Sequence, residues 1–381
     1  MQYGFNDLPG SATDTDAETD TDSVCRGLAR CLPLEGLLPS GSSFVGEADS
    51  KAETQPAGST QTPAGQNSVE QKGHESTPEA AAGAVGVVTA HHLLGANDMD
   101  TLRQRLGEAR RVITVPGENT PWVRVRGSRW KAASKAIASG FKLDEGVVEV
   151  GLDHQFDDTL VGGFLDYVHA DSKMDGDTKV RSRGGRVGFY LTHNLDCGAW
   201  IDVVGRLGFD RNRLRYKKAG GAMAEVNGIE GVYGNLSVET GRSFEIVDSL
   251  RVEPQFQAVF TRSGKVTLTD ADGHRIEAKA HSDVTTRLGA LVEKSLTDPT
   301  GSDIRAYGKL SWERNWSRGP VIHYWSGKFV RPDWKGNRFI YGLGIEGTTE
   351  NKHTWHASVE QSRGGAFRND IRVDLGMRLR F

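Results

Sequence analysis

The sequence predicts an all-β protein: a twelve-stranded antiparallel transmembrane β-barrel with a lumenal α-helix, preceded by a disordered N-terminal segment. Residues 121–381 alternate between apolar and polar side chains in runs of about 10 to 14 residues, longer than the average strand and typical of membrane barrels. Short turns and long polar loops alternate between these runs. No run of about 18 apolar residues is present, which excludes transmembrane helices but not transmembrane strands.

The composition departs from that of an ordinary α/β enzyme. The 381 residues include 47 glycines, about 12%, where roughly 7% is usual. The net charge of −3 hides an asymmetry, because residues 1–96 carry 13 acids and 4 bases, and residues 97–381 carry 37 acids and 43 bases. The positive charge of residues 97–381 is too dilute for the clustered basic surface that nucleic acid requires, so we expect no nucleic-acid partner. The three cysteines form no CxxC pair and indicate neither a zinc site nor a disulfide scaffold.

Residues 1–96 form a first region, which we expect to be disordered and of low complexity. The acidic run DTDAETDTD is followed by a stretch rich in Glu, Gln, Ser, Thr, Pro, Ala and Gly, and such a composition buries too little apolar surface to order itself. The opening residues show no basic region followed by an apolar core, as a signal peptide would. We therefore expect the chain to be the C-terminal remnant of a longer gene product.

Residues 97–120 are assigned to a helix and a linker. The segment NDMDTLRQRLGEAR, residues 97–110, carries acids in its first turn and arginines at its end, as helices prefer. Its apolar stripe is thin, consisting of Met99, Leu102 and Leu106. A helix that is polar on most sides lies either in water or in a polar cavity, and the lumen of a barrel is such a cavity. We expect Arg103, Arg105 and Glu108 to face lumenal charges.

Residues 121–381 are assigned to the barrel, and the last strand carries the clearest pattern. Its apolar residues Val373, Leu375, Met377, Leu379 and Phe381 alternate with charged residues and a glycine. Equivalent runs predict twelve strands, beginning near residues 121, 142, 159, 181, 198, 228, 248, 281, 302, 338, 353 and 370. An even number of antiparallel strands with alternating short and long connections describes an up-and-down barrel with both ends on the short-turn side. Long loops are predicted at 132–141, 171–180, 211–226, 264–279, 317–337 and 364–369.

The inward rows of these strands explain the expected helix. We expect lumenal charges that face it to be Glu149, Asp153, Glu239, Glu253, Arg287, Arg372 and Arg378. Inward glycines are expected to leave room for a helix about 10 Å wide; they are Gly151, Gly241, Gly289, Gly342 and Gly344. Aromatic residues near strand ends fit interfacial girdles: Trp122, Trp200, Trp312, Trp316, Phe339, Tyr341 and Trp355.

Taken in order, these pieces resemble the C-terminal translocator domain of autotransporters, the type V secretion barrels of Gram-negative outer membranes. The resemblance runs from about residue 97 to 381, through TLRQRLGEAR, PWVRVRG, YLTHNLDCGAWIDVVG, LSVETGRSF, LRVEPQFQAVF and the terminal VDLGMRLRF. It implies a barrel in the outer-membrane lipid that translocates and anchors an N-terminal passenger at the cell surface. It also implies that the terminal Phe381 is the signal for the barrel assembly machinery.

The family resemblance raises one further expectation, self-cleavage of the passenger at an Asn-Asn pair near the helix. Here the corresponding pair is Asn97-Asp98, a departure that makes helix capping by Asn97 the simpler interpretation. We expect no catalytic, cofactor or metal site. Gly342, Gly344 and Gly347 match GxGxxG without the helix that must follow it. His281-Ser282-Asp283 contains triad residue types, but neighbouring residues in a strand point to opposite faces.

Two alternatives from other functional classes stay open at this point. The first is an outer-membrane barrel enzyme of the protease or phospholipase type, which needs a catalytic cluster in the long loops. The second is a plain diffusion pore, which needs no lumenal helix. Deleting the helix separates a plugged barrel from a pore, since only the first gains conductance.

Overall fold

The computed structural model describes residues 78–95, 117, 119–133, 140–297, 303–349 and 353–380. The described chain contains one helix, α2 (Pro78–Gly95), and seventeen strands. Twelve of these are long barrel strands: β1 (Asn119–Ala132), β2 (Phe141–Phe156), β3 (Thr159–Met174), β4 (Lys179–Asn194), β5 (Ala199–Lys217), β6 (Met223–Arg242), β8 (Leu250–Ser263), β11 (His281–Thr297), β12 (Asp303–Asn315), β15 (Gly336–Thr348), β16 (Thr354–Gly364) and β17 (Phe367–Arg378). Four short strands form a separate sheet, and β7 (Phe244–Val247) extends the turn before β8.

The barrel closes through pairings between neighbouring strands, all of them antiparallel. Strands β1 to β6 pair in chain order, β6 pairs with β8, β8 with β11, β11 with β12, and β12 with β15. Strands β15 to β17 continue the order, and β17 pairs with β1 along almost its whole length, from Phe367 opposite Ala132 to Arg378 opposite Trp122. The predicted twelve-stranded antiparallel barrel is confirmed. Closure leaves no unpaired strand edge, which a bilayer could not satisfy.

Side chains alternate between the two faces of the barrel wall. On β4, for example, Val187, Phe189 and Leu191 are exposed on the outer face, while Arg186 and Tyr190 are buried inside. The outer face therefore presents a contiguous apolar surface far larger than a soluble monomer exposes, whereas charged groups pair in the lumen. The alternation that the sequence shows thus has the physical cause expected of a membrane barrel. No described helix has both the length and the apolar character needed to cross a bilayer.

Strand positions agree closely with the sequence prediction. Eleven of the twelve strands begin within three residues of the predicted positions, and β6 begins at Met223 rather than near residue 228. The predicted loops at 171–180 and 211–226 are wrong over much of their length, because β3, β4, β5 and β6 continue through them and leave only short turns. These strands contain 16 to 20 residues, more than the 9–11 or so that span a bilayer, so the wall extends beyond the apolar belt here.

The prediction that residues 1–96 are disordered is wrong for Pro78–Gly95, which form α2. Pro78 lies at the first helical position, Glu79 gives the first turn an acid, and Gly95 ends the helix, all common at these positions. Residues 83–95 are buried on every side. A helix that is buried on every side carries no amphipathic periodicity, so its Ala-, Gly- and Val-rich sequence is easily taken for low complexity. The helix predicted at residues 97–110 and the segment 1–77 lie outside the described residues.

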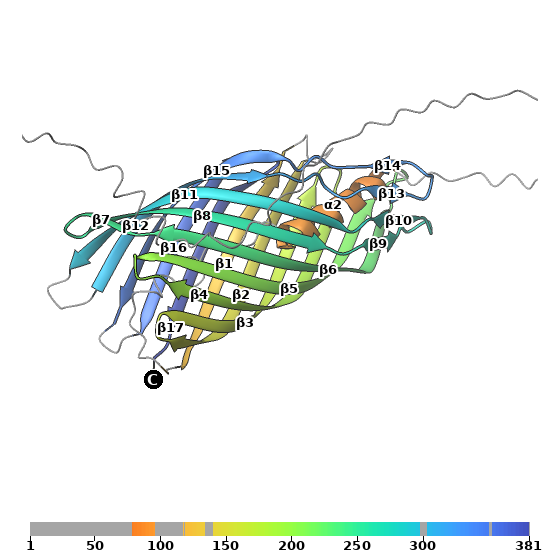
Figure 1. The fold of residues 1–381 in the computed structure, drawn as a ribbon. Helices are drawn as coiled ribbons and strands as arrows, with labels where there is room; N and C mark the ends of the chain where they lie inside the picture. Colours follow the sequence, from red (N-terminus) through yellow and green to blue (C-terminus); the bar gives the residue numbers. More distant parts are fainter. Residues whose placement is uncertain are drawn as a thin grey trace, which may run out of the picture. The chain divides into compact units, whose positions relative to one another are not determined.

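We call the end of the barrel that carries the β1–β2 connection and the four short strands of the separate sheet the long-loop end. Helix α2 lies in the half of the lumen at this end. Figure 1 shows it beside the short strands, at the end of the barrel opposite the C-terminus. Near the start of α2, a Cβ on Gly83 would meet Leu214, which lies close to the outer end of β5. At its end, Gly95 lies against Tyr233 in the middle of β6. The amino end of α2 therefore points to the long-loop end and its carboxyl end to the middle of the lumen.

A small sheet covers the long-loop end, formed by β9 (Val266–Thr269), β10 (Arg275–Ala278), β13 (Ile322–Tyr324) and β14 (Phe329–Val330). The β9–β10 hairpin joins β8 to β11, and the β13–β14 hairpin joins β12 to β15. The hairpins pair through β10 and β13, with Ile276 opposite Tyr324. We call this sheet the outer cap. Its buried side chains belong to the same apolar cluster as those of α2: Val266, Leu268, Ile276, Ala278 and Ile322.

Two contacts outside the bilayer strengthen the outer cap. The His274 ring stacks on Trp325, with centroids 5.2 Å apart, and joins one hairpin to the other. Lys218, in the turn between β5 and β6, bonds to Asp272 at the tip of the β9–β10 hairpin, with Nζ and Oδ1 2.5 Å apart. That hydrogen bond raises the pKa of Lys218 above its ordinary value. The hairpins and the β5–β6 turn thus form one connected layer.

The inward glycines accommodate aromatic rings of the neighbouring strands. Trp122 lies directly opposite Gly151, Trp200 opposite Gly241 and Tyr307 opposite Gly344, and a Cβ on any of these glycines would overlap the ring. The expectation that these glycines leave room for the helix is therefore wrong at these three positions. The predicted girdle is wrong for Trp122 and Trp200, which are buried in the lumen, while Trp316, Phe339 and Tyr341 are exposed.

Candidate functional site in the barrel lumen

The carboxyl end of α2 is held by donors from three adjacent strands. Arg186 of β4 donates to the Leu94 carbonyl at 3.2 Å, and Arg206 of β5 donates to the Gly95 carbonyl at 2.9 Å. Asn235 of β6 donates to the same Gly95 carbonyl at 3.3 Å. The last carbonyls of a helix have no partner within it and carry partial negative charge. The two guanidinium groups therefore satisfy these carbonyls and stabilise the helix in place.

A histidine–aspartate contact holds the same side of α2 one turn earlier. His91 Nδ1 lies 2.5 Å from Oδ1 of Asp210 on β5, and both side chains are almost fully buried. The His91 ring also packs edge-on against Tyr233, with centroids 5.5 Å apart. Strands β4, β5 and β6 thus form the side of the wall to which α2 is fastened most closely.

Apolar packing fills the rest of the outer half of the lumen. From α2, Val87, Val88, Leu93 and Leu94 are at most 2% exposed. They pack in one cluster with wall residues such as Leu214 and with the outer cap. Full burial of a side chain of this kind stabilises by about 1.5–3 kcal/mol relative to exposure. The outer half is thus a packed core that contains α2.

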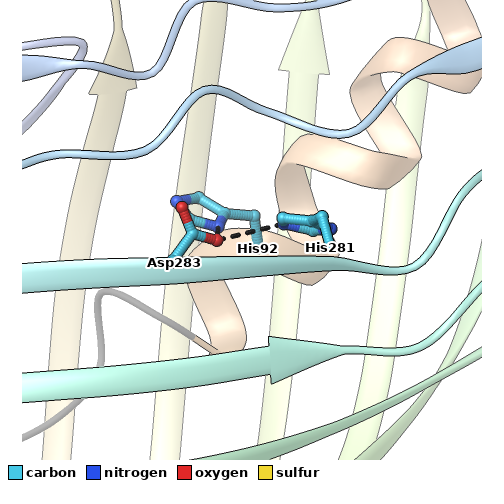
Figure 2. Close-up of side chains that lie close together, drawn as sticks. All are labelled: His92, His281 and Asp283. Carbon is cyan, nitrogen blue, oxygen red and sulfur yellow. Dashed lines mark ion pairs between the residues drawn. The ribbon is translucent and has the colours of Figure 1, made fainter. Parts of the chain in front are cut away.

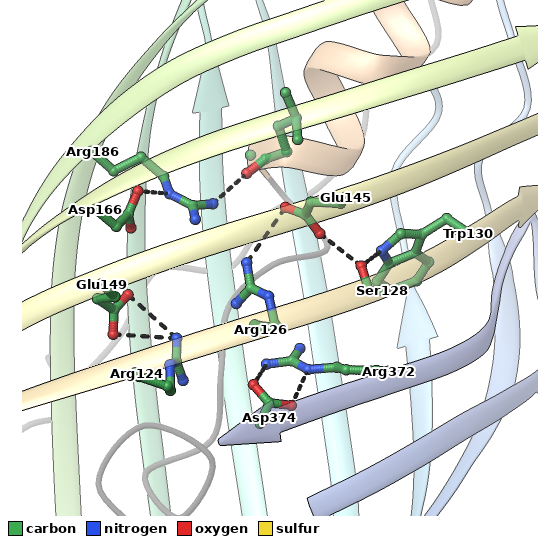
Figure 3. Close-up of polar contacts among 12 residues, drawn as sticks. Arg124, Arg126, Ser128, Trp130, Glu145, Glu149, Asp166, Arg186, Arg372 and Asp374 are labelled. Atoms are coloured by element: carbon green, nitrogen blue, oxygen red, sulfur yellow. Dashed lines mark hydrogen bonds and ion pairs between the residues drawn. The ribbon is translucent and has the colours of Figure 1, made fainter. Parts of the chain in front are cut away.

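The lumenal wall also carries buried charges that pair with one another, as Figure 3 shows in part. Arg124 lies within 3.3 Å of Glu149, and Glu145 accepts hydrogen bonds from Arg126 at 3.4 Å and from Ser128 at 2.8 Å. All five side chains are buried. Buried charges are tolerated when they are paired and hydrogen-bonded, and here each arginine is paired with a glutamate of the neighbouring strand.

A second polar network lies near the seam between the first and last strands. Trp122 Nε1 donates to the hydroxyl of Tyr190 at 2.9 Å, and that hydroxyl donates to Asp153 at 3.0 Å. Arg378 donates to the other oxygen of Asp153 at 2.7 Å. The predicted inward residues Asp153 and Arg378 thus form an ion pair between β2 and the end of β17.

The structure places the remaining predicted lumenal residues on the inner face as well. Glu149, Glu239, Glu253 and Arg372 are buried, and Arg287 is partly buried. Among the described residues, Arg372 pairs with Asp374, Arg287 with Glu313, and Glu253 accepts from Ser243. Their contact with the residues of the predicted helix is untested, since Leu102, Arg103, Arg105, Leu106 and Glu108 lie outside the described residues. So do Asn97, Asp98 and Phe381.

Sequence reasoning missed the wall residues that contact α2. Arg186, Arg206 and Asp210 stand on inward rows that the alternation identifies, but the alternation does not tell which inward residue meets a helix. The available signal was the helix itself: a Pro-initiated apolar run ending in Gly, with the adjacent pair His91-His92 in its last turn. Two adjacent histidines in an apolar run need partners on two different walls, because successive residues on a helix point about 100° apart.

A closed barrel with an apolar outer face, a charged inner face and a helix in its lumen defines the class of plugged outer-membrane barrels. Residues 121–360 match the family of the autotransporter beta-domain. The chain belongs to this family, which uses type V secretion, and it is located in the outer membrane.

Curated relatives share the barrel region. The chain is 27% identical over 278 residues to the BrkA autotransporter of Bordetella pertussis, which covers 70% of this chain and 26% of that protein. It is 28% identical over 274 residues to the pertactin autotransporter of Bordetella bronchiseptica, covering 70% of this chain and 29% of that protein. The chain thus spans less than a third of the length of these relatives.

Solved structures show the same fold. The β-domain of the Bordetella autotransporter BrkA superposes with a TM-score of 0.59 at 22% identity, covering 69% of this chain and 99% of that chain. The transport unit of AIDA-I from Escherichia coli gives a TM-score of 0.61 at 16% identity, covering 79% of this chain and 99% of that chain. At these identities the structures show the architecture alone.

Proposed function

We propose that this barrel translocates an N-terminal passenger across the outer membrane and then anchors it at the cell surface. The observation that supports this proposal best is the direction of α2, whose amino end lies at the long-loop end. Long loops face the cell exterior in membrane barrels, and short turns face the periplasm. A polypeptide that reaches α2 from its amino-terminal side therefore joins the lumen from outside the cell, as a translocated passenger does.

The packed outer half supports a closed state of the barrel, which we propose is its state once translocation has ended. An open diffusion pore does not fit a lumen in which α2 is buried among wall and cap residues. The enzyme alternative gains no support from family membership, because autotransporter translocator domains are typically not catalytic. We infer a transport and anchoring role, with any enzymatic activity belonging to a passenger.

The outer face suggests how the barrel is oriented in lipid. Above the apolar residues of β4 and β5, the outward rows become basic at the long-loop end, at Lys179, Arg181, Arg183, Arg211, Arg213 and Arg215. Some of these pair with acids, including Arg181 with Asp171 and Arg211 with Glu230. The excess of bases fits anionic lipid headgroups, which attract Lys and Arg at the membrane surface. We propose outer-membrane lipid as the partner of this rim.

Two further partners and sites follow from the family. We propose that the barrel assembly machinery recognises the C-terminal strand, in which Phe381 ends the alternating pattern. Such a strand is suited to pairing with the machinery by β-augmentation. Cleavage at Asn97-Asp98 and contacts between the lumenal charges and residues 97–110 stay predictions.

Export is tested by attaching a signal peptide and placing an epitope tag near Ser59. External protease applied to intact cells is expected to remove the tag. The matched control carries the tag in the short turn at Asp157-Asp158 between β2 and β3, where the periplasm should protect it. A protected Ser59 tag on a barrel that is heat-modifiable in the outer membrane would contradict translocation, and absence from that membrane would contradict the location.

A further inference from the structure

Strand β11, which is separated from β5 by β6 and β8, contributes to a cluster of three potential ligands. His92 of α2 meets His281 and Asp283 of β11, as Figure 2 shows. His281 and Asp283 are two residues apart on one strand and therefore share a face, although Ser282 between them points outward. The His92, His281 and Asp283 side chains are 0%, 10% and 1% exposed. The chain thus brings together three donors from segments about 190 residues apart.

Distances within the cluster match the separations between the ligands of a small metal ion. Oδ2 of Asp283 lies 3.4 Å from Nδ1 of His92 and 3.1 Å from Nε2 of His281, and one ligand atom from each residue lies within 4.8 Å of the others. Zinc binds nitrogen and oxygen at about 2.0–2.2 Å with tetrahedral geometry, which separates its ligand atoms by roughly 3.3–3.6 Å. The three donors therefore need only small rotations to surround one ion.

The polar atoms of the cluster have unused hydrogen-bonding capacity. Both ring nitrogens of His92 and of His281, and both carboxylate oxygens of Asp283, are buried without a well-formed hydrogen bond to any described residue. Buried polar groups in proteins nearly always have such a partner, and each unsatisfied one destabilises the fold. Apart from the ion pairs of Asp283 with the two rings, these six atoms lack hydrogen bonds to described residues, and a metal ion would accept lone pairs from both imidazoles and the carboxylate.

The surroundings complete a metal-binding environment. The His92 ring stacks on Trp334 with centroids 3.9 Å apart, and the ring of Phe367 lies 5.2 Å away. Trp334 also packs edge-on against His281 at 5.4 Å. A shell of aromatic side chains limits solvent access and strengthens electrostatic interactions with an ion inside it. Two imidazoles and one carboxylate form a donor set typical of zinc, with a fourth position for a water molecule.

We propose that His92, His281 and Asp283 bind one zinc ion, which fastens α2 to β11. The ion complements the contacts that His91, Leu94 and Gly95 of α2 make with β4 and β5, on a different side of the helix. Because one ligand comes from the helix and two from the wall, the site exists only while α2 is inserted. Zinc therefore stabilises the plugged barrel specifically. This inference concerns metal binding and is independent of whether the barrel exports a passenger.

The test uses the full chain, purified in detergent with a tag that contains no histidine and stripped with a chelator. Cobalt(II) reports tetrahedral coordination through its visible absorption bands, so we expect one cobalt per chain with an intense tetrahedral spectrum that zinc abolishes. His92→Gln and His281→Gln should each weaken binding by at least about tenfold, since even outer-shell changes cost that much in metal sites. The unmodified chain shows whether one tetrahedral ion binds, and the two variants assign that ion to this cluster.

The matched control is His169→Gln. His169 lies two residues before Asp171 on β3, with Nε2 and Oδ2 3.2 Å apart, so it repeats the spacing of His281 and Asp283 on the exposed outer face. This variant should bind cobalt as the unmodified chain does. The proposal is overturned by octahedral or substoichiometric binding in the unmodified chain. It is equally overturned if the His92 and His281 variants keep full affinity, or if the control loses as much as they do.

Discussion

Replacing Arg206 with leucine should open the barrel. Arg206 donates to the Gly95 carbonyl at 2.9 Å and to Asn235 at 3.2 Å, and it is 5% exposed. A hydrogen bond from a charged group contributes about 1.5–3 kcal/mol net. Since about 1.4 kcal/mol changes an equilibrium constant tenfold, the ratio of open to plugged barrels should rise roughly 10- to 100-fold. Arg186 is less suitable, because its removal would also leave Asp166 buried without its ion pair.

The measurement is single-channel conductance of the purified chain in a planar bilayer. The Arg206→Leu variant is expected to show more frequent and longer open events than the unmodified chain. Arg211→Leu is the matched control, because Arg211 lies on the same strand but is exposed on the outer face, where it pairs with Glu230. Equal open probability in the two variants would refute the conclusion that the Arg206 side chain holds α2 in the lumen.

Two more predictions concern packing. Gly344→Val should lower the temperature at which the folded barrel unfolds in a gel-shift assay, because a side chain there overlaps Tyr307 and overpacking costs about 1–3 kcal/mol. The control Gly205→Val, at an outward position with open space, should change that temperature little. Equal shifts in the two variants would contradict the conclusion that Gly344 is required by the Tyr307 ring. Ala84→Asp places an unpaired charge at a fully buried position of α2 and should raise the open probability of the barrel at least about tenfold. A conductance equal to that of the unmodified chain would show that α2 is not packed in the lumen as described.

The barrel was predictable because its physical constraints repeat along the chain. Every strand must be apolar outside and is free to be charged inside, so the alternation of Val373, Leu375 and Met377 with Arg372, Asp374 and Arg378 marks the strand and its inner face together. The same rule correctly placed Asp153 and Glu149 in the lumen.

Features formed by contacts distant in the chain were not predictable in this way. Helix α2 is buried all round and so carries no amphipathic signal, and the outer cap consists of strands of only two to four residues. Nothing near His92 in the sequence points to His281 or Asp283, which it meets only because α2 enters the lumen at that level. Local pattern reports the environment of a residue, whereas its partner depends on how the closed wall surrounds the helix.

The rings that cover glycines also fix how far each strand is shifted along its neighbour. A slip of one residue would turn the apolar face into the lumen, and a slip of two residues would restore the faces but move each ring from its glycine onto a residue with a side chain. A slip of two residues is disfavoured by three such pairs: Trp122 opposite Gly151, Tyr190 opposite Gly162, and Tyr233 opposite Gly208. Because strand number and total stagger together set the diameter of a barrel, these pairs determine the width of the space that α2 fills.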